Sequence, residues 1–275
     1  MPHPELDVSL PDLESWKTLC REQPFVCDPG ASREIVEQAK RQGIVSPHFG
    51  SIGPEQVKVG GPNYRESFFA GGLNPRARAL LDELAGMPKA SQRFRLRIFA
   101  PEALSPFALR LRGLYPLFYG SEYLPDKAER ERLFPIPHQD LESLSLPDAH
   151  FDIVFCNDLF EHLPDVPRAL SELARVLTSG GVLLSTFPFA YNQVETIVKA
   201  IREGDAVRVL GEPEYHANPV DPEAGSLVFQ IPGWDILETV RAAGFSRAEM
   251  RFVSSGARGI CATELAGIFF LRAVR

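Results

Sequence analysis

The stretch from Phe151 to Phe189 reads FDIVFCNDLFEHLPDVPRALSELARVLTSGGVLLSTFPF and decides the fold. Its first apolar run predicts a buried strand over 151–156, which ends in the polar pair Asn157 and Asp158. A helix, a Gly-Gly turn and a second buried strand over 182–187 follow. In open parallel sheets, ligands bind beyond the carboxyl ends of the strands. We therefore expect a polar crevice beside Asn157 and Asp158.

Strand and helix patterns alternate on both sides of this unit. Ser105-Pro106 and Asp165 are typical helix starts, because the hydroxyl or carboxylate can accept a free N–H of the first turn. The segment 193–210 fits either a hairpin around Gly204-Asp205 or a helix, and both alternatives stay open. The alternation predicts an α/β fold with a doubly wound, mostly parallel sheet. The remaining apolar runs predict strands at 96–100, 117–120, 134–137, 245–253 and 267–274.

The chain before residue 93 has a different character. We expect residues 1–92 to form a helical and irregular N-terminal cap, and residues 93–275 to form the main domain with an insertion at about 190–232. In the cap, Ser32 is a candidate start for a helix that ends at Gly43. Asn74-Pro75 is the start expected for another helix.

The composition excludes several classes of protein. The 275 residues carry a net charge of −7 with a pI near 5.5, which disfavours a nucleic-acid partner. An apolar run of about 18 residues is absent from the sequence, so we expect no membrane partner. The acidic, proline-containing beginning is unlike a targeting signal. The four cysteines form no C-x-x-C pair, which favours a reduced, cytoplasmic protein without a zinc site.

Residues 95–274 resemble the class I S-adenosylmethionine-dependent methyltransferases. The resemblance rests on the FD-apolar-V run, the EH pair, the Gly-Gly turn and the acids after the predicted strands. It implies a Rossmann-like, seven-stranded sheet with an antiparallel last strand, and S-adenosylmethionine as cofactor. It also implies a cofactor-binding role for the residues that follow the second, third and fourth strands. These are Glu122 at the ribose, Asp140 and Leu141 at the adenine, and Asn157 and Asp158 at the methionine part, with Tyr123 as a further cofactor-binding residue.

Each of these residues also has an ordinary structural explanation. Glu122 could be a solvated surface glutamate, and Asp140 could cap a helix. Asn157 and Asp158 could serve the turn itself, since both residue types favour turns.

The first loop departs from the family pattern. It reads FAPEALSPFAL and has no glycine, although the family usually brings backbone close to the cofactor there. The resemblance implies that Glu102 takes the methionine ammonium group, while the helix that opens at Ser105 offers N–H groups to the methionine carboxylate. Tyr64 and Arg65 could close over the cofactor from the cap. A related subgroup from bacterial biosynthetic clusters has a cysteine-rich knuckle near the NYRES segment, whereas residues 69–72 of this chain are FAGG.

Methyl transfer needs alignment of the acceptor and often removal of a proton. His216 and His162 are the candidate bases, with Asp158 as a third catalytic candidate. Asp158, Glu161 and His162 form a D-x-x-E-H array that could share one helical face. Such an array can bind a metal, but this one is short and we expect no metal.

The leading hypothesis is a methyltransferase that acts on a small molecule or sugar-type metabolite, as a monomer or homodimer. A second hypothesis is a cyclase, a lyase of the same fold that releases methylthioadenosine, because the glycine-free loop could hold the cofactor in a folded pose. A third is a non-catalytic methyltransferase-like partner protein.

Overall fold

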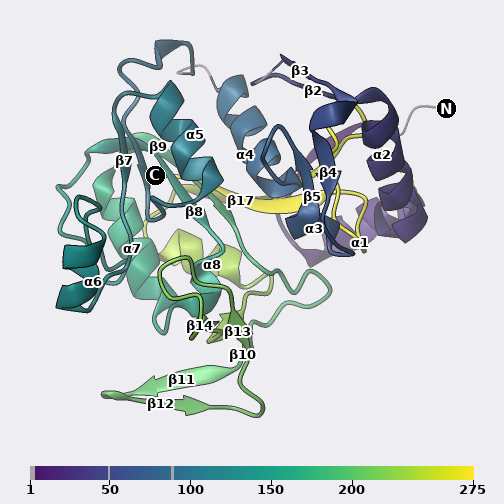
Figure 1. Ribbon diagram of the computed structural model, residues 1–275. Coiled ribbons are helices and arrows are strands. Elements are labelled where there is room, and N and C mark those ends of the chain that lie inside the picture. The colour runs from purple at the N-terminus through teal and green to yellow at the C-terminus, as the bar shows by residue number, and fades with distance from the viewer. Residues whose placement is uncertain (1–3, 49, 88–89) are drawn as a thin grey trace. The chain divides into compact units, whose positions relative to one another are not determined.

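The computed structural model describes residues 4–48, 50–87 and 90–275 (Figure 1). The chain divides into two compact units. The first comprises Met1–Gln92 and Glu249–Phe270, and the second comprises Arg93–Ala248 and Leu271–Arg275. In the described ranges no helix has the length and hydropathy that a membrane-spanning helix requires.

The second unit is built on a twisted sheet whose strand order is β17-β9-β8-β6-β7. Strands β7, β6, β8 and β9 run parallel, and β17 pairs antiparallel with β9 from Leu271↔Ser185 to Val274↔Val182. The predicted parallel sheet with an antiparallel last strand is thus confirmed. The bounds are β6 (Ile98–Ala100), β7 (Phe118–Gly120), β8 (Phe151–Asn157), β9 (Leu177–Thr186) and β17 (Ile268–Val274).

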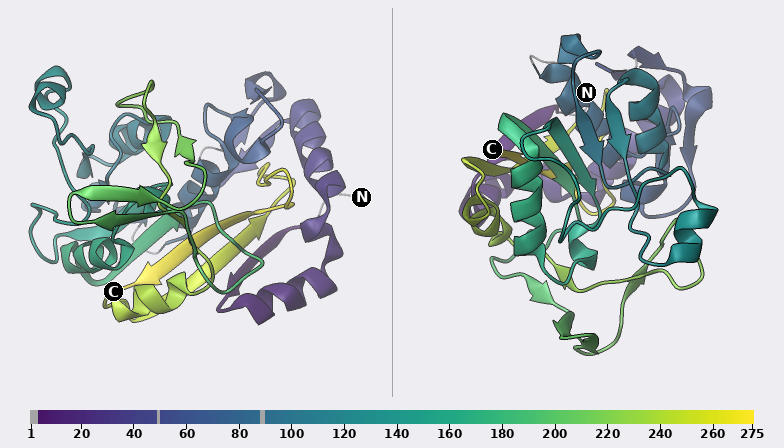
Figure 2. Two further views of the ribbon diagram at one scale, coloured as in Figure 1. Left: turned by 90° about the horizontal axis from the view of Figure 1, so that it is seen from below. Right: turned by 90° about the vertical axis from the view of Figure 1, so that its left-hand side faces the viewer.

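Helices cover both faces of this sheet. In the right-hand view of Figure 2, the strands lie between helix α7 (Val166–Val176) on one side and helix α5 (Pro106–Leu114) on the other. Both faces are therefore covered, which explains why β8 has four consecutive buried apolar residues, from Ile153 to Cys156, instead of an alternating pattern. The predicted caps form: Ser105 Oγ accepts the N–H of Ala108, and Asp165 Oδ1 accepts that of Arg168, both at 3.0 Å. Helix α8 (Ile236–Ala242) follows the insertion.

The sheet has seven strands, but not the seven that the sequence suggests. The expected strand at 134–137 is wrong: the segment is a turn, and only the next residue, His138, forms an isolated parallel bridge, with Glu122. Pro135 and Pro137 lack the N–H that a ladder needs. The seventh strand is instead β1 (Leu6–Leu10), which pairs antiparallel with β16 (Arg247–Ser254). Since β17 runs through both units, the full order is β1-β16-β17-β9-β8-β6-β7.

The insertion after β9 is made of short antiparallel pairs. The hairpin around Gly204-Asp205 forms, and the helical alternative is wrong. It projects away from the sheet at the lower end of Figure 1, and Ile201 and Val207 on it are exposed. The pairs are β11 (Ala200–Glu203) with β12 (Ala206–Val209), β10 (Ile197–Val198) with β15 (Gln230–Ile231), and β13 (Tyr215–His216) with β14 (Ser226–Leu227).

The first unit mixes helices with short strand pairs, so it is less purely helical than predicted. Helix α2 begins at Pro29 under a cap from Asp28, whose Oδ1 accepts the N–H of Gly30; Ser32 lies buried inside the helix and is not its start. The cap at Asn74 forms as predicted. The bounds are α1 (Leu13–Glu22), α2 (Pro29–Gln42), β2 (Ile44–Ser46), β3 (Gly50–Ile52), β4 (Val57–Val59), α3 (Tyr64–Ser67), β5 (Phe68–Ala70) and α4 (Pro75–Gly86).

An arginine lies at the centre of the first unit. Arg78 is fully buried on α4, and its guanidinium donates to the carbonyl oxygens of Leu73, Gly259 and Phe68 while it stacks on the Phe68 ring. Burial lowers the pKa of Arg78 to about 10, with Cys261 and Asp82 acting in the opposite sense. The side chain therefore joins α4, the turn after β5 and the chain at residue 259 through one group.

Candidate cofactor and acceptor site

The carboxylate of Glu122 holds the loop after β6 in place. Glu122 follows β7, and its Oε1 accepts the backbone N–H groups of Ala103 at 2.7 Å and Leu104 at 3.0 Å. Burial raises the pKa of Glu122, and these two N–H groups partly offset the effect. Glu122 is therefore not a solvated surface glutamate, which was the alternative explanation from the sequence. One of its two carboxylate oxygens already accepts hydrogen bonds from the protein.

A second acid of the loop meets the end of β8. The Nδ2 group of Asn157 donates to Glu102 Oε1 at 2.6 Å. Asn157 Oδ1 is buried and has no hydrogen-bond partner among the described residues. The structure thus brings Glu102, Glu122 and Asn157 to the carboxyl ends of three neighbouring strands.

The bulk of the glycine-free loop faces the protein interior. Pro101 and Ala103 are both buried, so their side chains pack inward. The close approach is provided by Gly120 at the end of β7, where an added Cβ would lie 3.1 Å from Glu102 O and 2.9 Å from the Phe118 ring. Gly120 thus allows the loop after β6 to pack closely on the end of β7, and the buried side chains of Pro101 and Ala103 do not crowd the outer side of the loop.

Asp140 lies in a turn and does not cap a helix. Its Oδ1 accepts the N–H of Glu142 at 2.8 Å. Leu141 is buried, while Tyr123 is 59% exposed and its ring lies 5.6 Å from that of His138. Burial raises the pKa of Tyr123, and the negative charges of Asp140 and Glu142 raise it further, which places the phenol close to both carboxylates.

Asp158 turns the chain at the end of β8. It has a φ of +48°, in the left-handed region that few residues other than glycine adopt, and its N–H donates to Thr186 O at 2.7 Å. Strained backbone of this kind is concentrated at functional sites. Burial raises the pKa of Cys156 inside β8, and the charges of Glu161, Glu102 and Asp158 add to the effect. Negative charge is therefore concentrated around the end of this strand.

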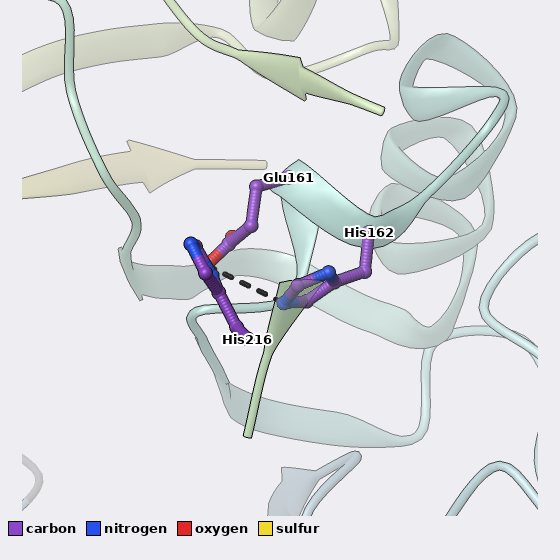
Figure 3. Close-up of side chains that lie close together, drawn as sticks. All are labelled: Glu161, His162 and His216. Carbon is purple, nitrogen blue, oxygen red and sulfur yellow. Dashed lines mark ion pairs between the residues drawn. The ribbon is translucent and has the colours of Figure 1, made fainter. Parts of the chain in front are cut away.

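The two candidate bases meet at one buried carboxylate (Figure 3). Glu161 and His162 lie in the 3₁₀ turn after β8 (Phe160–His162), and His216 comes from β13 of the insertion. Glu161 Oε1 lies 3.8 Å from His162 Nε2 and 3.7 Å from His216 Nδ1. The pKa of His216 is raised, chiefly because Glu161 stabilises the imidazolium, with Glu214 adding to this against burial.

The insertion is tied to this turn by backbone contacts. Phe229 N–H donates to Glu161 O at 2.7 Å, and the Nδ1 of His162 bonds Leu227 O at 2.8 Å. The pairing of Glu161 with His216 lies outside what the sequence could indicate, because the two residues are 55 positions apart and no spacing rule links them. Asp158, the third member of the expected array, is not part of the group of possible metal ligands, and His216 takes its place.

Tyr64 and Arg65 belong to the first unit. Tyr64 packs against its apolar core, and its N–H donates to Thr263 Oγ1 at 2.8 Å. Arg65 forms an ion pair with Glu66, which also binds Arg76. Their expected role over the cofactor remains a prediction.

The second unit is a doubly wound α/β domain with acidic and amide side chains at the carboxyl ends of its parallel strands. Residues 104–185 match the family described as "Methyltransferase domain". Over these residues, the match agrees with the resemblance to the class I S-adenosylmethionine-dependent methyltransferases that the sequence analysis described.

Similar proteins have several different acceptors. A sarcosine/dimethylglycine N-methyltransferase of Halorhodospira halochloris is 30% identical over 31% of this chain and 31% of its own length. A malonyl-[acyl-carrier protein] O-methyltransferase of Halorhodospira halophila is 31% identical over 40% of this chain and 41% of its own. The chain therefore aligns with less than half of either relative. A solved amino pentose methyltransferase of Micromonospora echinaspora is 19% identical, covers 72% of this chain and 89% of its own, and has a TM-score of 0.44.

Proposed function

We propose that this protein is an S-adenosylmethionine-dependent methyltransferase whose acceptor is a small molecule or sugar-type metabolite. The observation that carries the proposal is the meeting of Glu102, Glu122 and Asn157 at the ends of β6, β7 and β8. Carboxylates and amide oxygens at these places suit a ligand that offers hydroxyl and ammonium donors.

The charge of the site supports this cofactor. S-adenosylmethionine carries a sulfonium and an ammonium group, and three carboxylates surround the end of β8. Glu102 would accept the ammonium group together with the buried Asn157 Oδ1. Glu122 would offer its second oxygen to the ribose hydroxyls, and Asp140 its second oxygen to the adenine amino group, with Leu141 and Tyr123 beside the ring. When bound, the cofactor supplies an electrophilic methyl group, and the chain needs to orient the acceptor and receive a proton from it.

His216 is the residue that we assign to proton removal. It is the more exposed of the two histidines, at 32% of its side chain against 14% for His162, so an acceptor can reach it. The short strands of the insertion hold it against the turn after β8. His162, by contrast, is committed to Leu227 O through Nδ1 and serves to position that turn.

Isothermal titration with S-adenosylhomocysteine tests the cofactor assignment. We expect saturable binding, and the absence of heat at millimolar ligand would refute the assignment. The same experiment with Glu102→Gln as a variant should weaken binding, because an amide accepts the ammonium group without charge assistance.

A second function is favoured by the loop that Glu122 holds. The N–H groups of Ala103 and Leu104 are taken up by a protein carboxylate, so they cannot serve the cofactor as a glycine-rich loop would. In a different pose, the amine of the cofactor could attack the side-chain carbon that is bonded to sulfur in its own methionine part. That carbon–sulfur bond would break and methylthioadenosine would be released. Incubation with S-adenosylmethionine alone separates the two functions, since only a cyclase forms methylthioadenosine without an acceptor.

A further inference from the structure

We propose that Glu161, His162 and His216 bind a divalent transition-metal ion, for which Zn²⁺ and Co²⁺ are suitable probes. Each residue offers one ligand atom, and these atoms all lie within 4.8 Å of one another. Two imidazoles and one carboxylate are a donor set that such ions favour, and three protein ligands leave a coordination position open. With the ion bound, His216 is a ligand and not a base, so the role in proton removal assigned above applies to the metal-free protein.

The first argument is that the carboxylate of Glu161 accepts no hydrogen bond within the described residues. The side chain is fully buried, and within the described part of the chain neither of its oxygens has a hydrogen-bond partner. A buried carboxylate that accepts no hydrogen bond destabilises the fold unless a positive charge lies close to it. Lys199 of the insertion is engaged by Glu214. A metal ion between Glu161 and the two histidines would place a positive charge directly against this buried carboxylate.

The second argument is the orientation of the two rings. His162 Nδ1 lies 2.8 Å from a carbonyl oxygen, Leu227 O, so it must carry the proton and donate. His216 Nε2 lies 3.2 Å from Glu214 Oε1 and likewise donates to a carboxylate. In the neutral rings the lone pairs are then on His162 Nε2 and His216 Nδ1, the two atoms that face Glu161 Oε1. Three acceptor atoms that face one another repel unless a cation lies between them.

The third argument is distance. The separations from Glu161 Oε1, 3.7 and 3.8 Å, exceed the roughly 2.7–3.2 Å of an N–H···O hydrogen bond, so neither imidazole donates a normal hydrogen bond to this oxygen. Ligand atoms at about 2.1 Å from a tetrahedral ion lie about 3.4 Å apart, which is close to the two separations from Glu161 Oε1. Glu214 behind His216 and Leu227 O behind His162 provide the second-sphere acceptors that metal-bound histidines usually have.

The experiment is a titration of the tag-free full-length chain, freed of metal with a chelator, with Co²⁺ or Zn²⁺. Both visible absorption and calorimetry serve as readouts. Cys20 and Cys27 have sulfur atoms 3.1 Å apart and could bind the same ions, so every protein carries Cys20→Ser and Cys27→Ser. The titration contains no S-adenosylmethionine, and its result is therefore independent of the proposed methyl transfer.

We expect one equivalent to bind, with tetrahedral-type visible bands for Co²⁺. His216→Gln should weaken binding at least about 100-fold by removing a ligand, and Glu214→Gln about 10-fold by removing a second-sphere acceptor. His150→Gln, an exposed histidine outside the cluster, should bind as the parent does. His216 lies on a two-residue strand, so its variant should fold even where Glu161→Gln does not. Binding that is absent, or equal in the His216→Gln and parent proteins, would overturn the proposal.

Discussion

Replacing Glu122 by alanine or by glutamine separates two roles of this side chain. Alanine removes the acceptor of the Ala103 and Leu104 N–H groups. Hydrogen bonds to charged groups contribute about 1.5–3 kcal/mol each, so the pair has an upper limit of about 3–6 kcal/mol. Burial raises the pKa of Glu122 despite these bonds, so the cost of desolvating its charge offsets part of the stabilisation that the two hydrogen bonds provide. We expect Glu122→Ala to lower the free energy of unfolding by about 2–3 kcal/mol.

Glutamine should preserve the loop and impair the ligand site. Its amide oxygen has two lone pairs and can accept both N–H groups, so the free energy of unfolding should change by no more than about 1 kcal/mol. The second carboxylate oxygen becomes an NH₂ group, which cannot accept from a ribose hydroxyl. Loss of one charge-assisted bond of about 1.5–3 kcal/mol corresponds to an affinity for S-adenosylhomocysteine about 10- to 100-fold weaker.

The assays are urea unfolding and calorimetric titration of both variants beside the parent protein. If Glu122→Gln binds S-adenosylhomocysteine as tightly as the parent, Glu122 does not contact the ribose and serves only the loop. If Glu122→Ala is as stable as the parent, the two backbone bonds do not hold the loop.

Comparison of the parent with Glu122→Gln also predicts how the free energy of unfolding changes with pH. The pKa of Glu122 in the folded protein is raised above its ordinary value of 4.5. The stability that the protonated carboxyl contributes is therefore fully present below 4.5 and is lost as the pH rises through the folded pKa. The unfolding free energy of the parent relative to Glu122→Gln should fall as pH rises through this interval. The affinity of the parent protein for S-adenosylhomocysteine should instead rise with pH, because the ionised carboxylate accepts hydrogen bonds from the ribose hydroxyls more strongly than the protonated carboxyl does. If the difference in unfolding free energy between the parent and Glu122→Gln rises with pH, burial does not raise the pKa of Glu122.

Three further predictions concern other parts of the chain. Arg78→Ala should lower the free energy of unfolding by about 3–5 kcal/mol, because it leaves three buried carbonyl oxygens without their donor. Arg78→Lys should lower it less. Equal stability of the parent and both variants in urea unfolding would refute this role of Arg78. Gly120→Ala should cost about 1–3 kcal/mol by overpacking against Glu102 O and the Phe118 ring, and should also weaken S-adenosylhomocysteine binding, as paired unfolding and titration measurements would show. Diamide should link Cys20 to Cys27 with loss of two hydrogen atoms by mass spectrometry, faster at higher pH because burial raises the pKa of Cys20 to about 12; an unchanged mass would refute the pairing.

Local sequence signals were sufficient wherever one residue's chemistry decides the structure. Ser105, Asn74 and Asp165 each cap the helix that follows, because a short polar side chain reaches the free N–H groups only at that place. The apolar run of β8 predicts a strand buried on both faces, and the structure has one. The error at 134–137 has the same origin, since its apolar residues suggest a strand while its two prolines prevent a ladder.

Long-range partners were not predictable, and they decide the site. Nothing local in β1 marks it as the strand that completes the sheet beside β16. Glu122 could be assigned to a strand end from the sequence, but its bonds to Ala103 and Leu104 depend on the path of a loop that departs from the family pattern. The family resemblance predicts where acids stand, and only the three-dimensional contacts show which oxygen of each acid is still available.

The histidines make the same point with a chemical consequence. From the sequence, His162 and His216 were alternative bases, to be weighed against each other. In the structure they are two sides of one group, because the insertion returns to the turn after β8 through Phe229 and Leu227 and brings His216 to Glu161. His162 Nδ1 and His216 Nε2 already form hydrogen bonds to other groups. The remaining ring nitrogens, His162 Nε2 and His216 Nδ1, both lie near the buried carboxylate of Glu161. Those nitrogens must share either a proton or a cation with Glu161, so neither histidine can be assigned a role without the other.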